Sequence, residues 1–517
     1  MARTIVIGLD GGNWELISPW LESGELPNIA RLIERGATAT SHSYLPPVTV
    51  PNWKCYSTGK NPGKLSVYRF DHLDVRNENY VFHHSTDFKS AELWDYLNDE
   101  GYRTAVVNMP TTYPPREIDG AMICGGPDAR EGEYRALDDV YTYPESLQKK
   151  LEAEYDYAIH PKPLISSKDE RGEEVDAIQE LIDLRFRVAK DLLSREEFDF
   201  LHVTSFYSNT LQHFFWQEEP VFETWKLFDD HIGDFLELED TNVIVMSDHG
   251  CENVHTVVHL NNWLEKEGYL SLETSVDDVM NKAGLTKERV LQVSKKLGAT
   301  DTLARIIPEK IQNLVPWEEG VRGKRTFEKI NWEETDAVAN AQGLVYVAHE
   351  KDSETYNRVR SELLEKLGKL ESPTGEQVAK TIHRGEEYYE GPFLDKAPDL
   401  VIEFNAGYHL SEATGKEAVF NDTGRWEAEN IPPGIFAAMG PDITATEDLG
   451  EVKISDIMPT VLSLMDCRIP DDIDGEPIPV ADFEPEERNA LPSPHGDSDA
   501  DEDKEVRERL EDLGYLN

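Results

Sequence analysis

The stretch Pro46-Pro47-Val48-Thr49-Val50-Pro51-Asn52-Trp53 decides how the rest of the chain is interpreted. It places the hydroxyl of Thr49 between prolines that restrict the backbone, just before residues 52–57, which can begin a helix. The N-terminal end of a helix carries unpaired N–H groups and the positive end of the dipole, and both favour an anion. Because Pro-X-Thr-X-Pro is also an ordinary loop sequence, the role of Thr49 depends on the segments that accompany it.

Two apolar strands each end on residues that bind metals. The strand at 4–9 is followed by Asp10, and the strand at 243–247 is followed by Asp248 and His249. Carboxylate oxygens and imidazole nitrogens are common ligands of divalent metals. Either carboxylate alone could instead cap the helix that follows its strand. Together, and with Thr49, they predict one metal centre.

The order of these segments resembles the alkaline phosphatase superfamily, in its type I phosphodiesterase/nucleotide pyrophosphatase branch. The segments that carry the resemblance are Gly8-Leu9-Asp10-Gly11, the Thr49 stretch, Thr58-Gly59-Lys60-Asn61-Pro62, Ser247-Asp248-His249-Gly250, Asn261-Asn262-Trp263-Leu264, Ala397-Pro398-Asp399-Leu400, Gly434-Ile435-Phe436, Asp456-Ile457-Met458-Pro459-Thr460 and Leu513-Gly514-Tyr515-Leu516. The resemblance implies an α/β sandwich with a large, mostly parallel sheet flanked by helices, and the alternation of strands and helices along the chain agrees.

The resemblance also implies a chemistry. Thr49 would be the covalent nucleophile, and Asp10, Asp248, His249 and Thr49 would hold a divalent metal, Zn or Mn. A metal there would activate the hydroxyl and take up charge on the phosphoryl oxygens. Asn52 is a further candidate for the site. We therefore expect a metal-dependent phosphoester hydrolase or phosphotransferase that acts on a small anionic phosphoester, a diester rather than a monoester.

The second metal site of the family is incomplete in this sequence. The family pattern is Asp, three residues and His, followed much later by a His in a Gly-x-His-Arg context. Here the first pair is Asn209 and His213, and the later segment is Gly424-Arg425-Trp426. A neutral amide and one imidazole hold a divalent ion weakly. We therefore expect one metal site, with Asn209 and His213 as candidates for a second metal or for the substrate.

Three explanations of this difference stay open. The enzyme could use one metal, with His213 and Arg425 in contact with the substrate, since Arg suits phosphate oxygens. The protein could be a metal-binding pseudoenzyme. A sulfatase is a separate reaction class and not one of these three explanations. It is disfavoured, because Thr49 stands where sulfatases need Cys or Ser in a C/S-x-Pro-x-Arg sequence. Replacement ligands could also come from four other residues, although the two histidines among them fit an ordinary loop better: His255, His259, Glu427 and Glu429.

Other residues near these segments allow two interpretations each. Lys54, Lys60 and Lys64 form either a solvated helix face or a local cationic patch that attracts an anionic substrate. The aromatic residues Tyr68, Phe70 and 214–216 line a substrate pocket or, as is more common, belong to the core.

Composition limits the cellular context and the partners. The 517 residues include 101 acidic and 51 basic ones, a formal net charge of −50, spread along the chain. Such a surface repels nucleic acid and anionic lipid, and it indicates a salt-rich cytoplasm such as that of a halophilic archaeon. Four separated cysteines without a CxxC pair argue against a zinc-thiolate site. The chain shows no signal peptide and no apolar run long enough for a membrane span, so we expect a soluble cytoplasmic protein of unknown oligomeric state.

The sequence predicts one large domain with two appendages. Residues 1–482 form the catalytic domain, with a charged helical insertion, the cap, at about 264–335. Residues 113–166, rich in Pro, Gly, Asp and Tyr, are expected to be irregular. Residues 483–505 form an acidic flexible linker, and 506–517 form a helix that docks back.

Overall fold

A central sheet of nine strands organises the molecule. The computed structural model describes residues 2–83, 85–125, 140–160, 171–273, 327, 329–416 and 418–495. The nine strands are β1 (Arg3–Leu9), β2 (Ala37–His42), β5 (Thr104–Pro110), β6 (Gly120–Gly125), β7 (Thr142–Tyr143), β8 (Phe200–Ser205), β9 (Thr241–Met246), β19 (Pro433–Met439) and β20 (Asp448–Lys453). Their order in the sheet is β20-β2-β19-β9-β1-β8-β5-β6-β7.

The middle of this sheet is parallel. Neighbouring strands run parallel from β9 through β1, β8 and β5 to β6. The strand β19 is antiparallel to both of its neighbours, and β7 is antiparallel to β6. The parallel strands are almost wholly buried, which explains why their sequences are continuous apolar runs rather than alternating ones. The predicted α/β fold, with a large, mostly parallel sheet, is confirmed.

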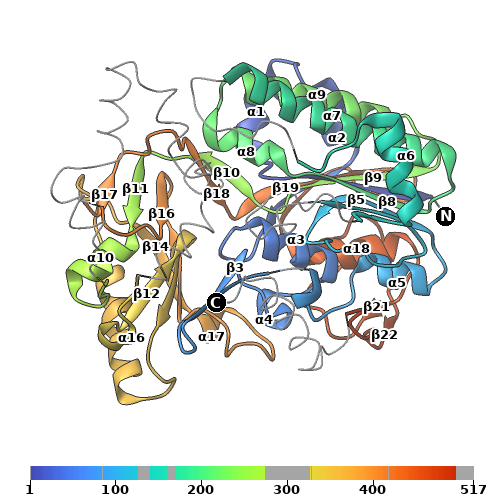
Figure 1. Ribbon diagram of the computed structural model, residues 1–517. Coiled ribbons are helices and arrows are strands. Elements are labelled where there is room, and N and C mark those ends of the chain that lie inside the picture. The colour runs from blue at the N-terminus through green and yellow to red at the C-terminus, as the bar shows by residue number, and fades with distance from the viewer. Residues whose placement is uncertain are drawn as a thin grey trace.

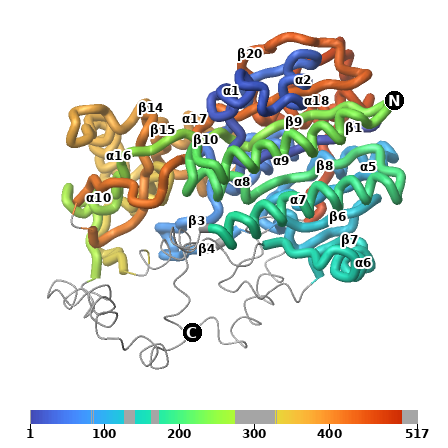
Figure 2. Tube along the Cα trace, turned by 90° about the horizontal axis from the view of Figure 1, so that it is seen from above, coloured from blue at the N-terminus to red at the C-terminus, as the bar shows by residue number. Residues whose placement is uncertain are grey.

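Helices cover both faces of the sheet (Figures 1 and 2). One layer contains α1 (Trp14–Glu22), α2 (Pro27–Arg35), α6 (Glu145–Tyr155), α7 (Arg171–Arg195), α8 (Tyr207–Phe214) and α9 (Glu219–Leu236). The other contains α3 (Thr49–Thr58), α4 (Pro62–Leu65), α5 (Leu93–Asp99) and α18 (Ile457–Leu464), with the short 3-10 turns η1 (Ser85–Asp87) and η6 (Ile454–Asp456). Alternate residues of each strand enter opposite layers: Ile5 and Ile7 pack in the first core, and Val6 packs in the second.

A second lobe with its own core lies beside the sheet, at the left of Figure 1. Its strands are β12 (Ala337–Asn340), β13 (Leu344–Val347), β14 (Ala379–Arg384) and β15 (Leu400–Phe404) in one sheet, and β11 (Thr256–His259), β16 (Tyr408–Ser411) and β17 (Phe420–Asn421) in another. Its helices and turns are α10 (Leu260–Glu267), α16 (Glu354–Leu367), α17 (Gly385–Tyr388), η4 (Trp332–Glu334) and η5 (Ala341–Gly343). The paired strands β10 (Gly250–Asn253) and β18 (Ala428–Ile431) lie between the lobe and the sheet.

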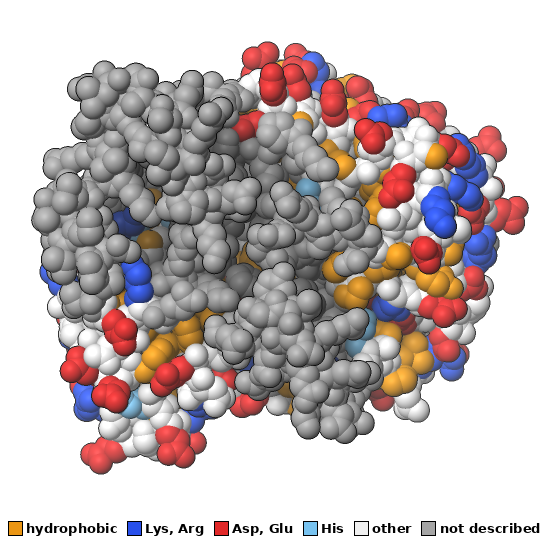
Figure 3. Space-filling model, in the orientation of Figure 1, with side chains coloured by type: hydrophobic (Ala, Val, Ile, Leu, Met, Phe, Trp, Pro, Cys, Tyr) orange, Lys and Arg blue, Asp and Glu red, His pale blue; other side chains and the backbone are white. Residues whose placement is uncertain are grey.

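Two small ribbons complete the described elements. The hairpin of β3 (Asp71–Asp74) and β4 (Asn79–Phe82) lies near α4, and β21 (Ile469–Pro470) pairs with β22 (Glu487–Arg488). No helix in the described ranges combines the length and the apolar composition that a membrane crossing needs. Figure 3 shows acidic side chains distributed over both sides of the visible face, as the composition predicts.

The expectation of an irregular segment at 113–166 is wrong for much of its described part. Residues 120–125 form β6 inside the central sheet, 142–143 form β7, and 145–155 form α6. The strand β6 has a four-residue apolar run, residues 121–124, between Gly120 and Gly125, and the glycines and the nearby prolines hid it in the sequence.

The expected appendages fall largely outside the described residues. This holds for 274–326 of the insertion, for 496–505 of the linker and for all of the C-terminal helix at 506–517. Within the expected linker, Arg488 lies in β22 and forms ion pairs with Asp99 at 2.6 Å and Glu100 at 3.2 Å. Residues 487–488 are therefore attached to the main body.

Candidate active site

Two adjacent parallel strands bring three ionisable side chains together. Because β1 and β9 are parallel neighbours, Asp10 and Asp248 emerge at the same edge of the sheet. His249 Nε2 lies 3.2 Å from Asp248 Oδ2 and 3.7 Å from Asp10 Oδ1, and all three side chains are buried. Among the His, Cys, Asp and Glu side chains that the structure describes, this is the one group of three whose ligand atoms lie within 4.8 Å of one another.

Thr49 points its hydroxyl at this group. It is the first residue of α3, after Val48 as the N-cap, and its Oγ1 lies 3.4 Å from His249 Nε2. At the start of a helix the backbone N–H groups of Thr49 and Val50 have no partner within the helix, so they are available to a negatively charged oxygen. The structure thus brings together the four residues on which the sequence interpretation rests.

The lone pairs of this group converge. His249 Nδ1 lies 2.9 Å from the carbonyl oxygen of Gly250, which can only accept, so Nδ1 carries the proton and Nε2 presents its lone pair. Among the described residues, Asp10 Oδ1 and Asp248 Oδ2 have no hydrogen-bond donor. Several buried acceptors without a donor are unstable as they stand, and a divalent cation satisfies all of them.

The pKa shifts of Asp10, Asp248 and His249 also fit a metal site. Burial raises the pKa of Asp10 well above its usual value, and burial together with the charge of Asp10 raises that of Asp248. Burial lowers the pKa of His249 to about 3, so its imidazole is neutral at physiological pH. Neutral imidazole and two carboxylates that repel each other form a donor set that fits a divalent metal.

Close backbone packing fixes the two carboxylates. Trp53 Nε1 donates to Asp10 Oδ2 at 3.1 Å, and the backbone N–H of Gly11 donates to Asp248 Oδ1 at 3.3 Å. Gly11 has a φ of 74°, and a Cβ there would lie 2.6 Å from Asn209 Oδ1. A Cβ on Gly8 would lie 2.4 Å from the Trp53 ring. These two glycines let the strand end, the indole and the amide approach one another.

An amide pair occupies the neighbourhood of the expected second metal. Asn209 Nδ2 donates to Asn430 Oδ1 at 3.0 Å, and the Asn209 amide also lies close enough to Asp10 to lower its pKa against the larger effect of burial. Asn430 comes from β18, which pairs with β10 directly after the metal-binding residues. Asn209, at the position where the resemblance implies a carboxylate ligand, is thus a neutral amide bonded to another neutral amide.

His213 lies one helical turn after Asn209 in α8, and its side chain contacts β18 and Trp426. Its Nδ1 donates to the carbonyl oxygen of Ala428 at 2.8 Å, and its ring stacks on Trp426 with the centroids 4.0 Å apart. The structure therefore brings Asn209 and His213 to the edge of the metal group, and among the described residues His213 belongs to no cluster of three potential His, Cys, Asp or Glu ligands.

Glu429, one of the replacement ligands considered from the sequence, is already fully bonded. It accepts from His409 Nδ1, from Trp426 Nε1 at 3.2 Å and from the N–H of Asn430 at 2.9 Å. Burial alone would raise the pKa of Glu429, but the charge and the hydrogen bond of His409, with the charge of His213, lower it to about 2. No local sequence pattern links His409 to Glu429, because they lie in different strands, β16 and β18, and come together only in the fold.

The four remaining candidates lie elsewhere or have another role. His255 is exposed, and its ring lies 5.3 Å from that of Tyr408. His259 is buried at the end of β11, where burial lowers its pKa to about 4. Arg425 is exposed on a turn, and Glu427 joins the His213 carbonyl through its backbone N–H at 2.7 Å.

Asn52 is buried and acts on the loop before Thr49. Its Nδ2 lies within hydrogen-bond distance of the carbonyl oxygens of Tyr44, Pro46 and Val48, at 3.0–3.1 Å, and its Oδ1 accepts from the Tyr44 N–H at 2.8 Å. The geometry therefore makes Asn52 a residue that positions Thr49.

The predicted basic patch is neither a solvated face nor a free cationic surface. Lys54 is buried and pairs with Glu92 at 2.6 Å, Lys60 pairs with Asp472, and Lys64 pairs with Asp474 at 2.7 Å. The carboxylates that neutralise these lysines lie up to 412 residues away, so the sequence could not show the pairing.

The aromatic residues singled out from the sequence belong mainly to the cores. Tyr68 and Phe215 are buried core residues, and Phe70, Phe214 and Trp216 pack partly buried against the cores. This supports the core interpretation of these aromatic residues.

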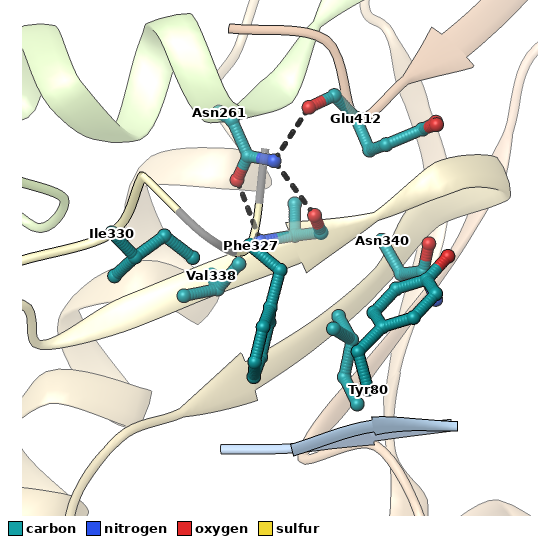
Figure 4. A pocket seen from close by; sticks show the side chains of 9 residues that line it. Tyr80, Asn261, Phe327, Ile330, Val338, Asn340 and Glu412 are labelled. Carbon is teal, nitrogen blue, oxygen red and sulfur yellow. Dashed lines mark hydrogen bonds between the residues drawn. The ribbon is translucent and has the colours of Figure 1, made fainter. Parts of the chain in front are cut away.

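A small cavity lies within the core of the second lobe, away from the metal group. It is lined by Tyr80, Asn261 and Glu412 among others (Figure 4). Its volume of about 10 Å³ holds about one water molecule.

Comparisons with known proteins agree with this geometry. A family model described as type I phosphodiesterase/nucleotide pyrophosphatase matches residues 4–426. A search of curated proteins found no match. The alkaline phosphatase PafA is similar in structure, with 14% identity, a TM-score of 0.53, and coverage of 92% of this chain and 98% of that chain. Phosphonoacetate hydrolase from Sinorhizobium meliloti 1021, with phosphonoacetate bound, has 15% identity, a TM-score of 0.51, and coverage of 84% and 89%.

Proposed function

Because the chain belongs to the type I phosphodiesterase/nucleotide pyrophosphatase family of hydrolases, we propose that it is a metal-dependent phosphodiesterase whose nucleophile is Thr49. The observation that carries the proposal is the convergence of Thr49 Oγ1, His249 Nε2 and two carboxylate oxygens without donors. The preference for a diester over a monoester follows the family and has no separate support in the site.

Asp10, Asp248, His249 and Thr49 are the residues that would hold a divalent metal, Zn or Mn. When bound, such an ion supplies positive charge for the phosphoryl oxygens and favours the ionised form of the hydroxyl. The residues of the chain bind the substrate and position the reacting groups. The start of α3 offers N–H groups to a phosphoryl oxygen, and Asn52 and Trp53 hold the nucleophile and Asp10 in place.

Turnover would proceed in two displacements at phosphorus. Thr49 Oγ attacks, the bond to the leaving alcohol breaks, and a phosphothreonine ester forms. Water then attacks phosphorus and releases Thr49. Each step exchanges one P–O bond for another. In the first step the hydroxyl proton of Thr49 passes to the oxygen of the leaving alcohol, and in the second a proton of the attacking water passes to the Thr49 oxygen.

We propose a single metal site. The Asn209–Asn430 amide pair and the fully bonded Glu429 support it, because neither offers a charged ligand beside His213. The same observations favour a second candidate function, a metal-binding pseudoenzyme that lacks turnover.

Hydrolysis of an aryl phosphodiester in molar KCl, with Mn or Zn added, distinguishes the two candidates. The wild type should turn over with one equivalent of metal bound, and Thr49→Ala should lose at least about a thousandfold of that activity while binding metal and unfolding at a similar temperature. Thr49→Ser, which keeps the hydroxyl, is the matched control. Full activity of Thr49→Ala would refute the nucleophile, and metal binding without turnover of several diesters and monoesters would favour the pseudoenzyme.

The net charge of −50 supports a further part of the proposal, namely that the enzyme works in high salt, as in a halophilic archaeon. Salt screens the repulsion among exposed carboxylates, so a fold that is strained at low salt becomes stable at high salt.

A further inference from the structure

A second charged group lies at the carboxyl edge of the sheet, beside the metal-binding residues. Arg185 extends from α7 and its side chain is completely buried. The guanidinium lies 5.4 Å from the ring centre of Tyr207, the first residue of α8. The next residue, Ser208, donates to the carbonyl oxygen of Asp10 at 2.9 Å. Only the start of α8 therefore separates Arg185 from the metal group.

The guanidinium is only partly satisfied. Nη2 donates to the carbonyl oxygen of Ile159 at 2.6 Å, whereas Nε and Nη1 have no hydrogen-bond acceptor in the described structure. None of the ion pairs found among the described residues includes Arg185. Burial lowers the pKa of Arg185 from its usual value, but an arginine side chain keeps its charge in a protein.

A buried cation without a counterion is costly, especially where carboxylates are so abundant. Burying a charge costs several kcal/mol unless a partner compensates it. The lysine nearest to Thr49 in the sequence shows the usual solution, because Lys54 is equally buried and pairs with Glu92. Among the described residues, Arg185 differs from Lys54 in having no carboxylate partner. Its polar neighbours are the hydroxyls of Tyr157 and Tyr207, and the Tyr157 hydroxyl lies close enough to influence the pKa of Arg185 by hydrogen bonding.

That environment is itself held in place. Tyr157 donates its hydroxyl to Asn108 Oδ1, and the Tyr207 hydroxyl is hydrogen-bonded to His160 Nδ1. Asn108 lies near the end of β5 with a φ of 56°, in the left-handed region that Asn adopts more readily than most residues. Ligands of open parallel sheets bind at this carboxyl edge.

We propose that Arg185 is the centre of an anion-binding site for a small oxyanion, with Nε and Nη1 as its donors. The oxyanion is either a free ion such as inorganic phosphate or a second anionic group of the substrate; the latter source alone rests on the proposed function. Guanidinium groups prefer phosphate and carboxylate oxygens, and the site would neutralise the one buried cation that the described residues leave unpaired.

Phosphate binding to Asp248→Asn tests the free-ion source, since this variant lacks the complete metal group but keeps Arg185. We expect one phosphate per chain by calorimetry at constant ionic strength, and an increase in Tm of about 1–3 °C. Adding Arg185→Met should abolish both. Adding Arg187→Met instead should abolish neither, because Arg187 is an exposed residue on the same helix that pairs with Asp183.

Kinetics test the substrate source. For an aryl phosphodiester that carries a carboxylate on its leaving group, Arg185→Met should raise KM at least about tenfold, and for the neutral analogue it should leave KM unchanged. Arg185→Lys, which keeps the charge but loses the planar donors, should fall between. If Arg185→Met does not fold, Arg185→Lys takes its place in the phosphate titration and in the kinetic comparison.

The stability of the ligand-free variant separates binding from a structural role. Without phosphate, Arg185→Met should have a Tm equal to or above that of the wild type, because it removes an unpaired buried charge. A lower Tm together with unchanged phosphate binding and an unchanged KM ratio would overturn the proposal and leave Arg185 as a tether for the Ile159 carbonyl. If the protein has no turnover, the phosphate titration decides alone, and absence of binding overturns the proposal.

Discussion

Asp10 and Asp248 are two buried carboxylates that face the same point, and their repulsion makes the metal-free protein less stable than it could be. We predict that Asp248→Asn raises the free energy of unfolding in EDTA by about 1–3 kcal/mol at pH 7 and abolishes the stabilisation by metal. Denaturant titration with and without Mn or Zn measures both effects. A variant that is less stable in EDTA, yet still stabilised by metal, would contradict this account of the group.

The pH dependence of the metal-free wild type follows from the same two carboxylates. A carboxylate whose pKa is higher in the folded state than in the unfolded state binds more protons when folded. Its contribution to stability is therefore lost as pH rises from about 4 through the raised value. His249, with a folded pKa of about 3, acts oppositely between about 3 and 6.5, so its effect is complete by neutral pH. Stability in EDTA should therefore fall as pH rises through the raised pKa values of Asp10 and Asp248, and the slope should be smaller for Asp248→Asn.

Asn209 provides the test of the single-metal site. Asn209→Asp would remove the donor to Asn430 and place a third carboxylate beside Asp10. We predict a loss of about 1–3 kcal/mol of stability in EDTA, and no second equivalent of bound metal. Metal stoichiometry by mass spectrometry or calorimetry decides. Two tightly bound ions in this variant would show that one charge is all that the second site lacks, and Asn209→Gln is the neutral control.

At the scale of the element, α3 depends on the loop that enters it. Asn52 holds three carbonyl oxygens of residues 44–48, so Asn52→Ala should cost about 2–4 kcal/mol of stability and lower kcat by about tenfold or more through displacement of Thr49. Thermal unfolding and kinetics measured on the same preparation check this. A loss of activity at unchanged stability would mean that Asn52 instead contacts the substrate.

The elements that could be predicted from sequence are those with continuous apolar runs or a strong helical period. The buried strands β1 and β9 agree with the strands predicted at 4–9 and 243–247 to within a few residues. Thr49, Asp10, Asp248 and His249 were predictable as a set because each one directly follows a strand or begins a helix. The partners Asn430, His409 and Arg185 were not, because long-range pairing positions them and no local pattern reports it.

At the scale of the whole molecule, charge dominates. With 101 acidic residues against 51 basic ones, the folded chain repels itself at low ionic strength. We predict that raising KCl from about 0.2 M to about 2 M increases Tm by several degrees, and that the gain saturates once the screening length falls to a few ångströms. Scanning calorimetry in KCl and in equal concentrations of glycerol separates screening from general stabilisation. A Tm independent of KCl would remove the support for a halophilic origin.

The position of β19 has a consequence for synthesis. This strand, residues 433–439, lies between β2 and β9, and its Ile435 N–H donates to Ser247, whose hydroxyl in turn donates to the carbonyl of Gly12. The edge formed by β2 and β20 therefore cannot join the sheet until the ribosome has made more than four-fifths of the chain. Until then the nascent chain exposes an unpaired β9 beside two metal-binding side chains. Chains that end before residue 433 should therefore lack a complete sheet and be prone to aggregate, and their Asp10, Asp248 and His249 should hold metal more weakly than in the protein that includes β19.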